Sequence, residues 1–407
     1  MEEKVFAIIG SGPAGYKAAL ELRNKFPDAK IYLFEKNKLG GTCLHRGCIP
    51  SKQLHSVTSF EEFTKSLKKT KLLLEKGLTS ELKAASIEII MEEATVSTEN
   101  DSVFVNSLNH NLKVDYLVLA LGSKPRKLNS AREIFTSDDF FSDDFLVKPM
   151  AQSYCFIGGG YISVELASML ASLGAKVKIL EKEKNILGFL DEQLRSKLIE
   201  YLERQGIVVK TSVNDLDSVK EELVIANLGR EAQSEDEFAL DKTLLDKKIF
   251  SIGDMHTAMP LAHYAYYQAR EVAKKIYALE QSPNEAETQS ESAIDLTLVP
   301  QVIFTKPELA HIGMDLIQAK EAYGDSLRVI EKSWATNAKA RIIKEDRAYF
   351  RMLYEEKDKK ILGYSLIGKG ATDLISIAVP ILSKALTLDD VENMIFPHPT
   401  LGELFAL

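Results

Sequence analysis

Two of the chain's three cysteines, Cys43 and Cys48, have only four residues between them. Two thiols this close can open and close as a disulfide and so pass electrons. The spacing fits one turn of irregular helix, which brings two sulfurs within bonding range. If Ser51 and Lys52 begin or continue a helix, its dipole and the charge of Lys52 would stabilise a thiolate. The alternative is a cysteine pair that only fills the core, as we expect for Cys155 inside a predicted strand. A zinc site is not indicated, because no second cysteine pair or paired histidines accompany these two.

A second group suited to proton transfer lies near the end of the sequence, where His398 and Glu403 stand in Pro-His-Pro-Thr-Leu-Gly-Glu. Histidine titrates near neutral pH, so His398 can take a proton from a dithiol and return it. Glu403 could orient the ring and raise its basicity. Taken alone, the motif also fits a surface histidine in a proline turn. The cysteine pair in the same chain favours the catalytic interpretation.

A nucleotide-binding element precedes the cysteines and would position them. The residues predict a strand over Lys4–Ile9, a G-x-G-x-x-G loop over Gly10–Gly15, a helix over Ala14–Arg23 and a strand over Lys30–Phe34. In such a βαβ unit the glycines allow a tight turn and a close approach of the backbone to a pyrophosphate. The helix N-terminus favours the same anion. Glu35 ends the second strand, where a carboxylate can accept hydrogen bonds from ribose.

The same order recurs later in the chain. A strand is predicted at Ser153–Ile157, a glycine loop at Gly158–Gly160, a helix at Ile162–Leu173 and a strand at Lys176–Leu180, followed by Glu181. A duplicated βαβ unit implies two dinucleotide-binding domains. The carboxylate of Glu181 suits a free 2′-hydroxyl and repels a 2′-phosphate, which favours NAD over NADP.

The remaining patterns complete an α/β fold with two Rossmann-like dinucleotide-binding domains and a separate C-terminal α+β domain. The predicted division is 1–150 (first dinucleotide-binding domain), 151–249 (second dinucleotide-binding domain), 250–292 (return to the central part) and 293–407 (C-terminal domain). Between the two fingerprints we expect a helix over Phe60–Lys76, short strands over Ile87–Asn111 and a buried strand over Val114–Leu121. Later, Ile249–Asp254 is predicted as a strand and turn, Leu261–Leu279 as a helix and Glu280–Ser292 as a linker.

Composition limits the class of protein. The 407 residues are 45% hydrophobic and 27% charged, as is ordinary for a globular protein. A chain of this length is too long for one hydrophobic core and should divide into domains. The net charge of −8 argues against nucleic acid as a partner. No apolar run reaches the length of a membrane span. A strand pattern begins directly at the N-terminus, so we expect no signal peptide. We therefore expect a cytoplasmic protein, in which a close cysteine pair is catalytic rather than structural.

Five stretches occur in one order: Gly10–Gly15, Gly40–Lys52, Gly158–Glu165, Ser251–Asp254 and His398–Glu403. In these stretches the chain resembles the flavin-dependent pyridine nucleotide-disulfide oxidoreductases, most closely the members that oxidise dihydrolipoamide. The resemblance implies FAD and NAD as cofactors. It makes 1–150 the FAD-binding domain, 151–249 the NAD-binding domain, 250–292 a return to the FAD-binding or central part, and 293–407 a dimerisation domain. It also implies a homodimer in which His398 reaches the cysteine pair of the partner subunit.

The resemblance implies roles for single residues. Cys48 would lie against the flavin and Cys43 would meet the substrate. Lys52 would approach the flavin and pair with Glu165 near the nicotinamide. The residues implied for FAD are Gly10, Gly12, Pro13, Ala14, Gly15, Glu35, Gly41, Thr42, Lys52, Gly122, Asp254 and Ala262. The residues implied for NAD are Gly158, Gly160, Tyr161, Ile162, Glu181 and Gly229. No metal is expected.

The implied reaction moves electrons from dihydrolipoamide through the Cys43–Cys48 disulfide and FAD to NAD⁺. The substrate would be a lipoyl-bearing protein or a small dithiol or disulfide. Two alternatives stay open: an NAD(P)H-dependent reductase of another low-molecular-weight disulfide, and a non-catalytic flavoprotein subunit. The chain is shorter than typical members of the family. The losses are expected in the compact stretches Glu93–Val114 and Asn227–Lys248, and the second of these would trim the NAD site.

Overall fold

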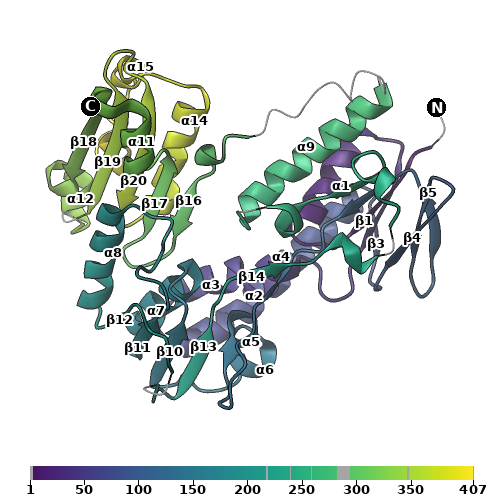
Figure 1. Cartoon of the computed structure of the whole chain (residues 1–407), viewed down its shortest axis with the longest axis horizontal. Coiled ribbons are helices and arrows are strands. Elements are labelled where there is room, and N and C mark those ends of the chain that lie inside the picture. The colour runs from purple at the N-terminus through teal and green to yellow at the C-terminus, as the bar shows by residue number, and fades with distance from the viewer. Residues whose placement is uncertain are drawn as a thin grey trace. The chain divides into compact units, whose positions relative to one another are not determined.

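The structure of the chain, a computed structural model, describes residues 3–216, 219–238, 240–257, 259–281, 294–345 and 348–406 (Figure 1). The chain divides into two compact units. Unit 1 comprises Met1–Met150 and Leu228–Glu291, and unit 2 comprises Ala151–Asn227 and Ser292–Leu407. The predicted linker, Glu280–Ser292, falls almost entirely on residues outside the described part of the chain.

The core of unit 1 is a parallel sheet with the strand order β15-β7-β1-β2-β3. The strands are β1 (Val5–Ile9), β2 (Lys30–Phe34), β3 (Glu88–Ile90), β7 (Tyr116–Leu119) and β15 (Ile249–Ser251). The first strand lies in the middle and later strands are added on both sides, which is the order of dinucleotide-binding folds. The predicted strand at 30–34 is confirmed, and the one at 114–121 is shorter at both ends.

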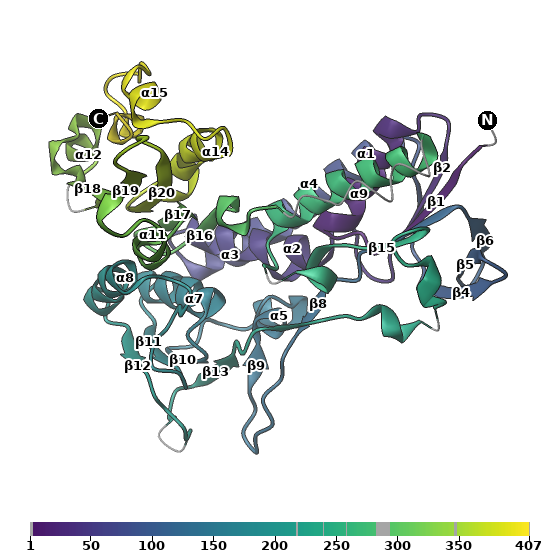
Figure 2. The same cartoon turned by 45° about the horizontal axis from the view of Figure 1, so that its top comes forward.

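Helices cover one face of this sheet and a small sheet covers the other. Helices α1 (Pro13–Lys25) and α9 (Ala262–Gln281) lie side by side in Figures 1 and 2. Because strand side chains alternate between faces, Phe6 and Ile8 pack toward these helices, whereas Ala7 and Ile9 pack toward the small antiparallel sheet. That sheet consists of β4 (Thr95–Glu99), β5 (Ser102–Asn106) and β6 (Asn111–Val114). The predicted short strands in this region are confirmed.

The segment that carries the cysteines folds into helices. It contains α2 (Gly41–Arg46), α3 (Cys48–His55) and α4 (Phe60–Ala84). Helix α4 begins where the Ser59 side chain accepts a hydrogen bond from the backbone N–H of Glu62, and it extends two turns beyond the predicted Lys76. The other short elements of unit 1 are β8 (Ser123–Pro125), β9 (Phe135–Thr136), α5 (Ser137–Phe140), α6 (Asp143–Leu146) and β14 (Arg230–Ala232).

The first segment of unit 2 repeats the βαβ arrangement. Its parallel strands lie in the order β12-β11-β10-β13, with bounds β10 (Ser153–Ile157), β11 (Lys176–Leu180), β12 (Val208–Lys210) and β13 (Leu223–Ala226). Its helices are α7 (Tyr161–Ser172) and α8 (Glu192–Arg204). Both predicted strands are confirmed, and Cys155 is fully buried in β10, as expected of a core cysteine.

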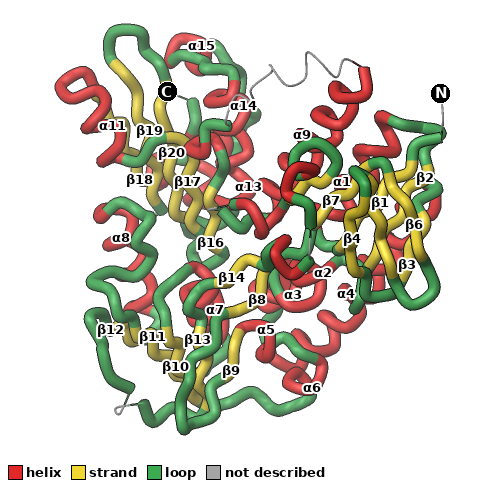
Figure 3. The backbone as a smooth tube through the Cα atoms, turned by 45° about the vertical axis from the view of Figure 1, so that its right-hand side comes forward, coloured by secondary structure: helices red, strands yellow, loops and turns green. Residues whose placement is uncertain are grey.

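The second segment of unit 2 is an antiparallel sheet with the order β16-β17-β20-β19-β18 (Figure 3). The strands are β16 (Gln301–Ile303), β17 (Leu309–Gly313), β18 (Leu327–Ser333), β19 (Tyr349–Glu355) and β20 (Ile361–Ile367). The helices are α11 (Leu316–Tyr323), α12 (Ala338–Ile342), α13 (Ala371–Leu374), α14 (Ala378–Ser383) and α15 (Leu388–Glu392). Strands and helices are segregated, which confirms the predicted α+β class. The fully buried Trp334 lies in the core of this segment.

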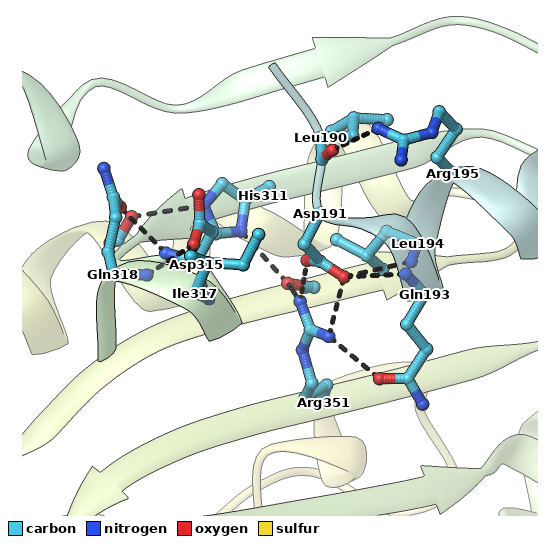
Figure 4. Close-up of polar contacts among 12 residues, drawn as sticks. Leu190, Asp191, Gln193, Leu194, Arg195, His311, Asp315, Ile317, Gln318 and Arg351 are labelled. Carbon is cyan, nitrogen blue, oxygen red and sulfur yellow. Dashed lines mark hydrogen bonds and ion pairs between the residues drawn. The ribbon is translucent and has the colours of Figure 1, made fainter. Parts of the chain in front are cut away.

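A buried polar network joins the two segments of unit 2 (Figure 4). Arg351 of β19 forms an ion pair with Asp191, the N-cap residue of α8, and both side chains are at most 2% exposed. Arg351 also donates to Ser365 of β20 at 3.3 Å, and Ser365 lies 3.0 Å from Nδ1 of His311 on β17. Burial, and then the charge of Arg351, lower the pKa of His311. A neutral His311 can donate from Nε2 to the Gly313 carbonyl, 3.1 Å away, and accept from Ser365 at Nδ1.

Candidate active site

The first glycine loop of unit 1 has the geometry of an anion cradle. Gly10 has a φ of +98°, and a Cβ there would lie 2.3 Å from the Ala120 carbonyl oxygen. A Cβ on Gly15 would lie 1.8 Å from the Gly10 carbonyl oxygen, so helix and strand pack closely only with glycine. Gly12 caps α1 without a side-chain hydrogen bond and faces open space, with Pro13 in the first turn and no acidic residue there. The loop therefore fits a pyrophosphate, as the sequence predicts.

Other residues predicted for FAD converge on the same end of α1. A Cβ on Gly41 would lie 2.8 Å from Cα of Gly12, so the start of α2, with Thr42, packs against the loop. A Cβ on Gly253 would lie 2.9 Å from Cβ of Ala14, which places the turn containing Asp254 there too. Gly122, with a φ of +77°, follows β7 and faces open space, and Ala262 begins α9.

Glu35 directly follows β2, beside the glycine loop, and is buried. Its Oε2 accepts hydrogen bonds from the backbone N–H and the hydroxyl of Ser11, at 3.0 and 2.6 Å, and its Oε1 accepts from the N–H of Asn37 at 2.8 Å. A carboxylate oxygen can accept more than one hydrogen bond, so these contacts leave room for the ribose bond. That bond stays a prediction.

A polar chain that the sequence interpretation missed supports Asp254. Arg230 donates to the Ser123 hydroxyl at 2.8 Å, and Ser123 donates to Asp254 at 2.5 Å. Arg230 also forms an ion pair with Asp138 at 2.7 Å, and all of these residues belong to unit 1. The signal in the sequence was the Leu-Gly-Arg stretch, from which only Gly229 was predicted, for NAD. Gly229 directly precedes β14 in unit 1, and β14 pairs with β8, the strand that directly follows Gly122, a residue predicted for FAD.

The two cysteines lie on consecutive helices rather than on one irregular turn. Gly47, with φ −135° and ψ −114°, separates α2 from α3, and Cys48 is the first residue of α3. The side chains of Cys43 and Cys48 are hydrogen-bonded to each other. This hydrogen bond, followed by burial, raises the pKa of the Cys43 thiol, while the charge of Lys52 acts in the opposite direction. Lys52 lies on α3, as predicted. The two side chains therefore contact each other, as two cysteines that close as a disulfide must.

Unit 2 carries the second glycine loop. Gly158 has a φ of +97°, and Gly160 caps α7 without a side-chain hydrogen bond and faces open space. Tyr161 and Ile162 form the first turn, which has no acidic residue. Glu181 ends β11 and accepts hydrogen bonds from the N–H groups of Gly159 at 2.5 Å and Glu183 at 2.8 Å. The loop fits a second dinucleotide as the first loop does.

The predicted base, His398, is hydrogen-bonded to Glu403. Nδ1 of His398 lies 2.8 Å from Oε1 of Glu403, and the histidine side chain is 70% exposed. Glu403 also accepts from the N–H of Thr400 at 2.8 Å, which fixes the carboxylate at the start of the turn η8 (Leu401–Leu404). The hydrogen bond to His398, followed by that to Thr400, holds the pKa of Glu403 below its usual range. The exposed face of the imidazole is left for a substrate.

Replacing His398 with alanine should raise the pKa of the Glu403 carboxyl, because the largest cause of its depression is removed. The pKa should still stay below the usual range of a glutamate, since the hydrogen bond from the N–H of Thr400 remains. A lowered carboxyl pKa stabilises the folded state above the unfolded pKa, and this contribution is lost as the pH falls through the folded value. The replacement should therefore reduce the loss of folding stability at low pH that comes from protonation of Glu403. A ¹³C NMR titration of the Glu403 carboxyl measures the shift, with His256→Ala as a control.

The structure brings some predicted site residues together and leaves others in separate units. Cys43, Cys48 and Lys52 belong to unit 1, whereas Glu165 and His398 belong to unit 2. Glu165 is buried on α7 and accepts a hydrogen bond from the N–H of Phe304 at 3.0 Å. The pairing of Lys52 with Glu165 and the reach of His398 to a partner's cysteines stay predictions.

Two dinucleotide folds with glycine loops, and a pair of thiols beside the first loop, define a dinucleotide-dependent disulfide oxidoreductase. Residues 4–245 match the family model of the pyridine nucleotide-disulphide oxidoreductases, and residues 299–407 match the dimerisation domain of the same family. The chain belongs to this family. It is therefore a flavoprotein of the oxidoreductase class that uses FAD and NAD(P), and its dimerisation domain supports a homodimer.

Curated relatives cover nearly the whole chain. Dihydrolipoyl dehydrogenases are 29% identical in Mycoplasma genitalium, 28% in Bacillus subtilis strain 168 and 27% in Staphylococcus aureus. Each alignment covers 98% of this chain and 94–96% of the relative. The alignment with the Mycoplasma protein spans 452 positions, so relatives carry segments that these 407 residues lack.

Solved structures confirm the fold. The flavoprotein disulfide reductase RclA from Escherichia coli, HOCl-induced and solved as a Cu(II) complex, has a TM-score of 0.83 at 21% identity, with 100% of this chain and 98% of that chain covered. LpdA from Mycobacterium tuberculosis has a TM-score of 0.84 at 18% identity, with 98% and 97% covered. Within the residues described here, no helix combines the length and apolar character needed to span a bilayer.

Proposed function

We propose that the protein is a dihydrolipoamide dehydrogenase that transfers electrons from dihydrolipoamide through FAD to NAD⁺. The observation that carries this proposal is the contact between the Cys43 and Cys48 side chains, on the consecutive helices α2 and α3, of which α2 begins against the FAD-type glycine loop. The names of the curated relatives support the choice of substrate. The proposal includes a homodimer that acts in the cytoplasm on a lipoyl-bearing protein or a small dithiol.

The chain's own residues would carry out the exchange of bonds. His398 of one subunit would take a proton from the dithiol substrate, and the substrate thiolate would attack Cys43 of the other. The substrate–Cys43 disulfide forms as the Cys43–Cys48 bond breaks, and Cys48 leaves as a thiolate. The second substrate thiol then displaces Cys43, which releases the substrate as a disulfide and leaves two reduced cysteines. Bound FAD would carry the electron pair on to the nicotinamide.

The residues proposed to hold the cofactors are those predicted from the sequence. In unit 1 the loop around Gly12, the start of α2 and the turn at Asp254 would hold FAD, with Lys52 toward the flavin ring. In unit 2 the loop around Gly160 and the carboxylate of Glu181 would hold NAD. The division into FAD-binding, NAD-binding, returning and dimerisation segments is part of the same proposal.

A substrate comparison tests the proposal. The purified protein with FAD should reduce NAD⁺ with dihydrolipoamide, and its kcat/KM should exceed that for glutathione disulfide with NADH by at least about 100-fold, or roughly 2.7 kcal/mol of transition-state discrimination. A preference for another disulfide would replace the proposal with that of a reductase of low-molecular-weight disulfides. Bound FAD without turnover of either substrate would favour a non-catalytic flavoprotein.

The preference for NAD depends on Glu181 and has its own test. Replacing Glu181 with serine should raise the kcat/KM ratio of NADP⁺ to NAD⁺ by about tenfold or more, since like charges in contact cost on the order of 1.4 kcal/mol or more. Steady-state kinetics with both cofactors give the ratio. Glu183→Ser is the matched control, because only its backbone N–H contacts Glu181. A Glu181→Ser ratio equal to that of the control would remove the argument for NAD.

A further inference from the structure

The turn that carries the proposed base contacts Asn337, a buried residue from a distant part of the chain. The Nδ2 of Asn337 donates a hydrogen bond of 3.0 Å to the carbonyl oxygen of Thr400, 63 positions later. Thr400 lies between His398 and Glu403, and its N–H donates to Glu403 at 2.8 Å. All four residues belong to unit 2. The two contacts of Thr400 therefore connect Asn337 to the carboxylate that contacts the histidine.

The orientation of the Asn337 amide is determined by the two groups that it contacts. Its Oδ1 lies 2.9 Å from the N–H of Ala340 in the first turn of α12, and an N–H can only donate. Its Nδ2 faces the Thr400 carbonyl, which can only accept. Exchanging the two ends of the amide would place donor against donor and acceptor against acceptor. Asn337 thus caps α12 with its oxygen and holds Thr400 with its nitrogen.

Asn337 is fixed in the core of unit 2. It is 9% exposed, and its backbone N–H donates to the carbonyl of Trp334 at 2.9 Å. The fully buried Trp334 belongs to the same hydrophobic cluster as Leu404 and Phe405, the two residues that follow Glu403. The turn with the base is therefore attached to one core in two ways, through these apolar side chains at its end and through Asn337 at its middle.

The base itself is largely exposed, so neighbouring side chains do little to fix it. His398 is 70% exposed, and its Nδ1 lies 2.8 Å from Oε1 of Glu403. An ionised carboxylate only accepts, so a neutral His398 paired with Glu403 carries its hydrogen on Nδ1 and leaves Nε2 as the basic atom. The hydroxyl of Thr400 also donates to the carbonyl of Pro397, directly before the histidine, at 2.7 Å. A shift of Thr400 would therefore disturb both partners of the pair.

We propose that Asn337 is a positioning residue of the base, which keeps His398 hydrogen-bonded to Glu403 by holding the carbonyl of Thr400. The effect is on orientation, because Asn337 neither gains nor loses a proton, and the proton of the dithiol goes to Nε2 of His398. Proton transfer depends on such placement of the base. The inference deepens the disulfide exchange of the proposed function and rests on His398 as its base.

Replacing Asn337 with serine separates this role from helix capping. Serine caps a helix about as well as asparagine, but it has no amide to donate to Thr400. In the FAD-loaded protein with ¹⁵N-labelled histidine, NMR at alkaline pH shows which ring nitrogen carries the hydrogen, and His398→Ala identifies the signals. We expect the hydrogen on Nδ1 in wild type and both tautomers in Asn337→Ser. Asn393→Ser is the matched control, because Nδ2 of Asn393 also donates to a backbone carbonyl, that of Asp389, at 2.8 Å.

Steady-state kinetics give a second readout. The kcat/KM for dihydrolipoamide should fall about tenfold in Asn337→Ser, because a misplaced base slows proton transfer, whereas KM for NAD⁺ should change by less than about twofold. A loss of folded protein alone would lower the apparent kcat with both substrates and leave the tautomer unchanged. An unchanged kcat/KM beside mixed tautomers would overturn the positioning role.

The tautomers decide the remaining cases. Mixed tautomers in Asn337→Ser but not in Asn393→Ser support the role of Asn337, whereas a single tautomer in Asn337→Ser, or a mixture already in wild type, overturns it. If Asn337→Ser does not fold with FAD, Asn337→Asp decides in the same way, since an ionised aspartate caps a helix but cannot donate. The NMR measurement needs neither dihydrolipoamide nor NAD⁺. Mixed tautomers in a protein that fails the substrate comparison would refute the proposed substrate while supporting Asn337.

Discussion

Replacing Cys43 with serine should lower the rate of NAD⁺ reduction by dihydrolipoamide by about 1,000-fold or more, because a serine hydroxyl cannot form the disulfide with substrate. The structure supports a large effect, since Cys43 and Cys48 are in direct contact and no other sulfur is near the pair by sequence. In this variant Cys48 keeps its thiol but can no longer form a disulfide with residue 43. Steady-state kinetics at saturating NAD⁺ measure the loss.

Cys155→Ala is the matched control for this replacement. Cys155 is the third cysteine and is fully buried in β10, so its loss removes a thiol without touching the pair. The mass of the oxidised peptide that contains residues 43 and 48 reports disulfide formation without any turnover of substrate. It should be about two daltons lower than that of the reduced peptide in wild type and in Cys155→Ala, because closing a disulfide removes two hydrogens. Activity that persists in Cys43→Ser would refute the exchange step.

Replacing Asp191 with asparagine should lower the free energy of unfolding of unit 2 by about 3–5 kcal/mol, because it leaves Arg351 buried without its counter-charge. Arg351 is fully buried, and it also contacts Gln193 at 3.2 Å (Figure 4). Although burial acts to raise it, the hydrogen bond and charge of Arg351 hold the pKa of Asp191 below its usual range. The stabilisation is therefore present above the unfolded pKa and is lost as the pH falls through the folded value.

The fluorescence of Trp334 measures this loss. It is the chain's one tryptophan and is fully buried in the core of unit 2, so urea denaturation followed at this residue reports that unit. Asp315→Asn is the matched control, since Asp315 caps α11 as Asp191 caps α8, and asparagine caps a helix about as well as aspartate. The control should cost less than about 0.5 kcal/mol.

A double replacement separates the buried charge from simple loss of packing. Adding Arg351→Met to Asp191→Asn should recover much of the stability, because the uncompensated charge is then removed. If the double variant were no more stable than Asp191→Asn, the loss would come from packing or capping. If Asp191→Asn behaved as Asp315→Asn does, the ion pair would contribute little to unit 2.

Local features of the sequence were sufficient to predict the strands, the glycine loops and the positions of the chemically active residues. The strand over 153–157 follows from a short apolar run. Gly10 has a positive φ, and Gly15 packs against the carbonyl oxygen of Gly10 within the same loop. The contact of Cys43 with Cys48 and that of His398 with Glu403 join residues only five positions apart. Such short separations leave the chain little freedom, so spacing alone predicts the contact.

Tertiary structure decided the contacts between residues far apart in sequence. Arg351 meets Asp191 across 160 positions, Tyr16 meets Tyr266 across 250, and Ser123 meets Asp254 across 131. Asp254 belongs to a stretch that the sequence already marked for FAD, but no local pattern marks its partner Ser123 or the other residues of these pairs. Each of those residues reads in isolation as an ordinary polar residue of a helix, strand or turn. Their partners follow from which helix covers which face of a sheet, and that order is set by burial of apolar surface over the whole unit. The sequence thus determined which groups can do chemistry, whereas packing determined which buried charges and hydroxyls support them.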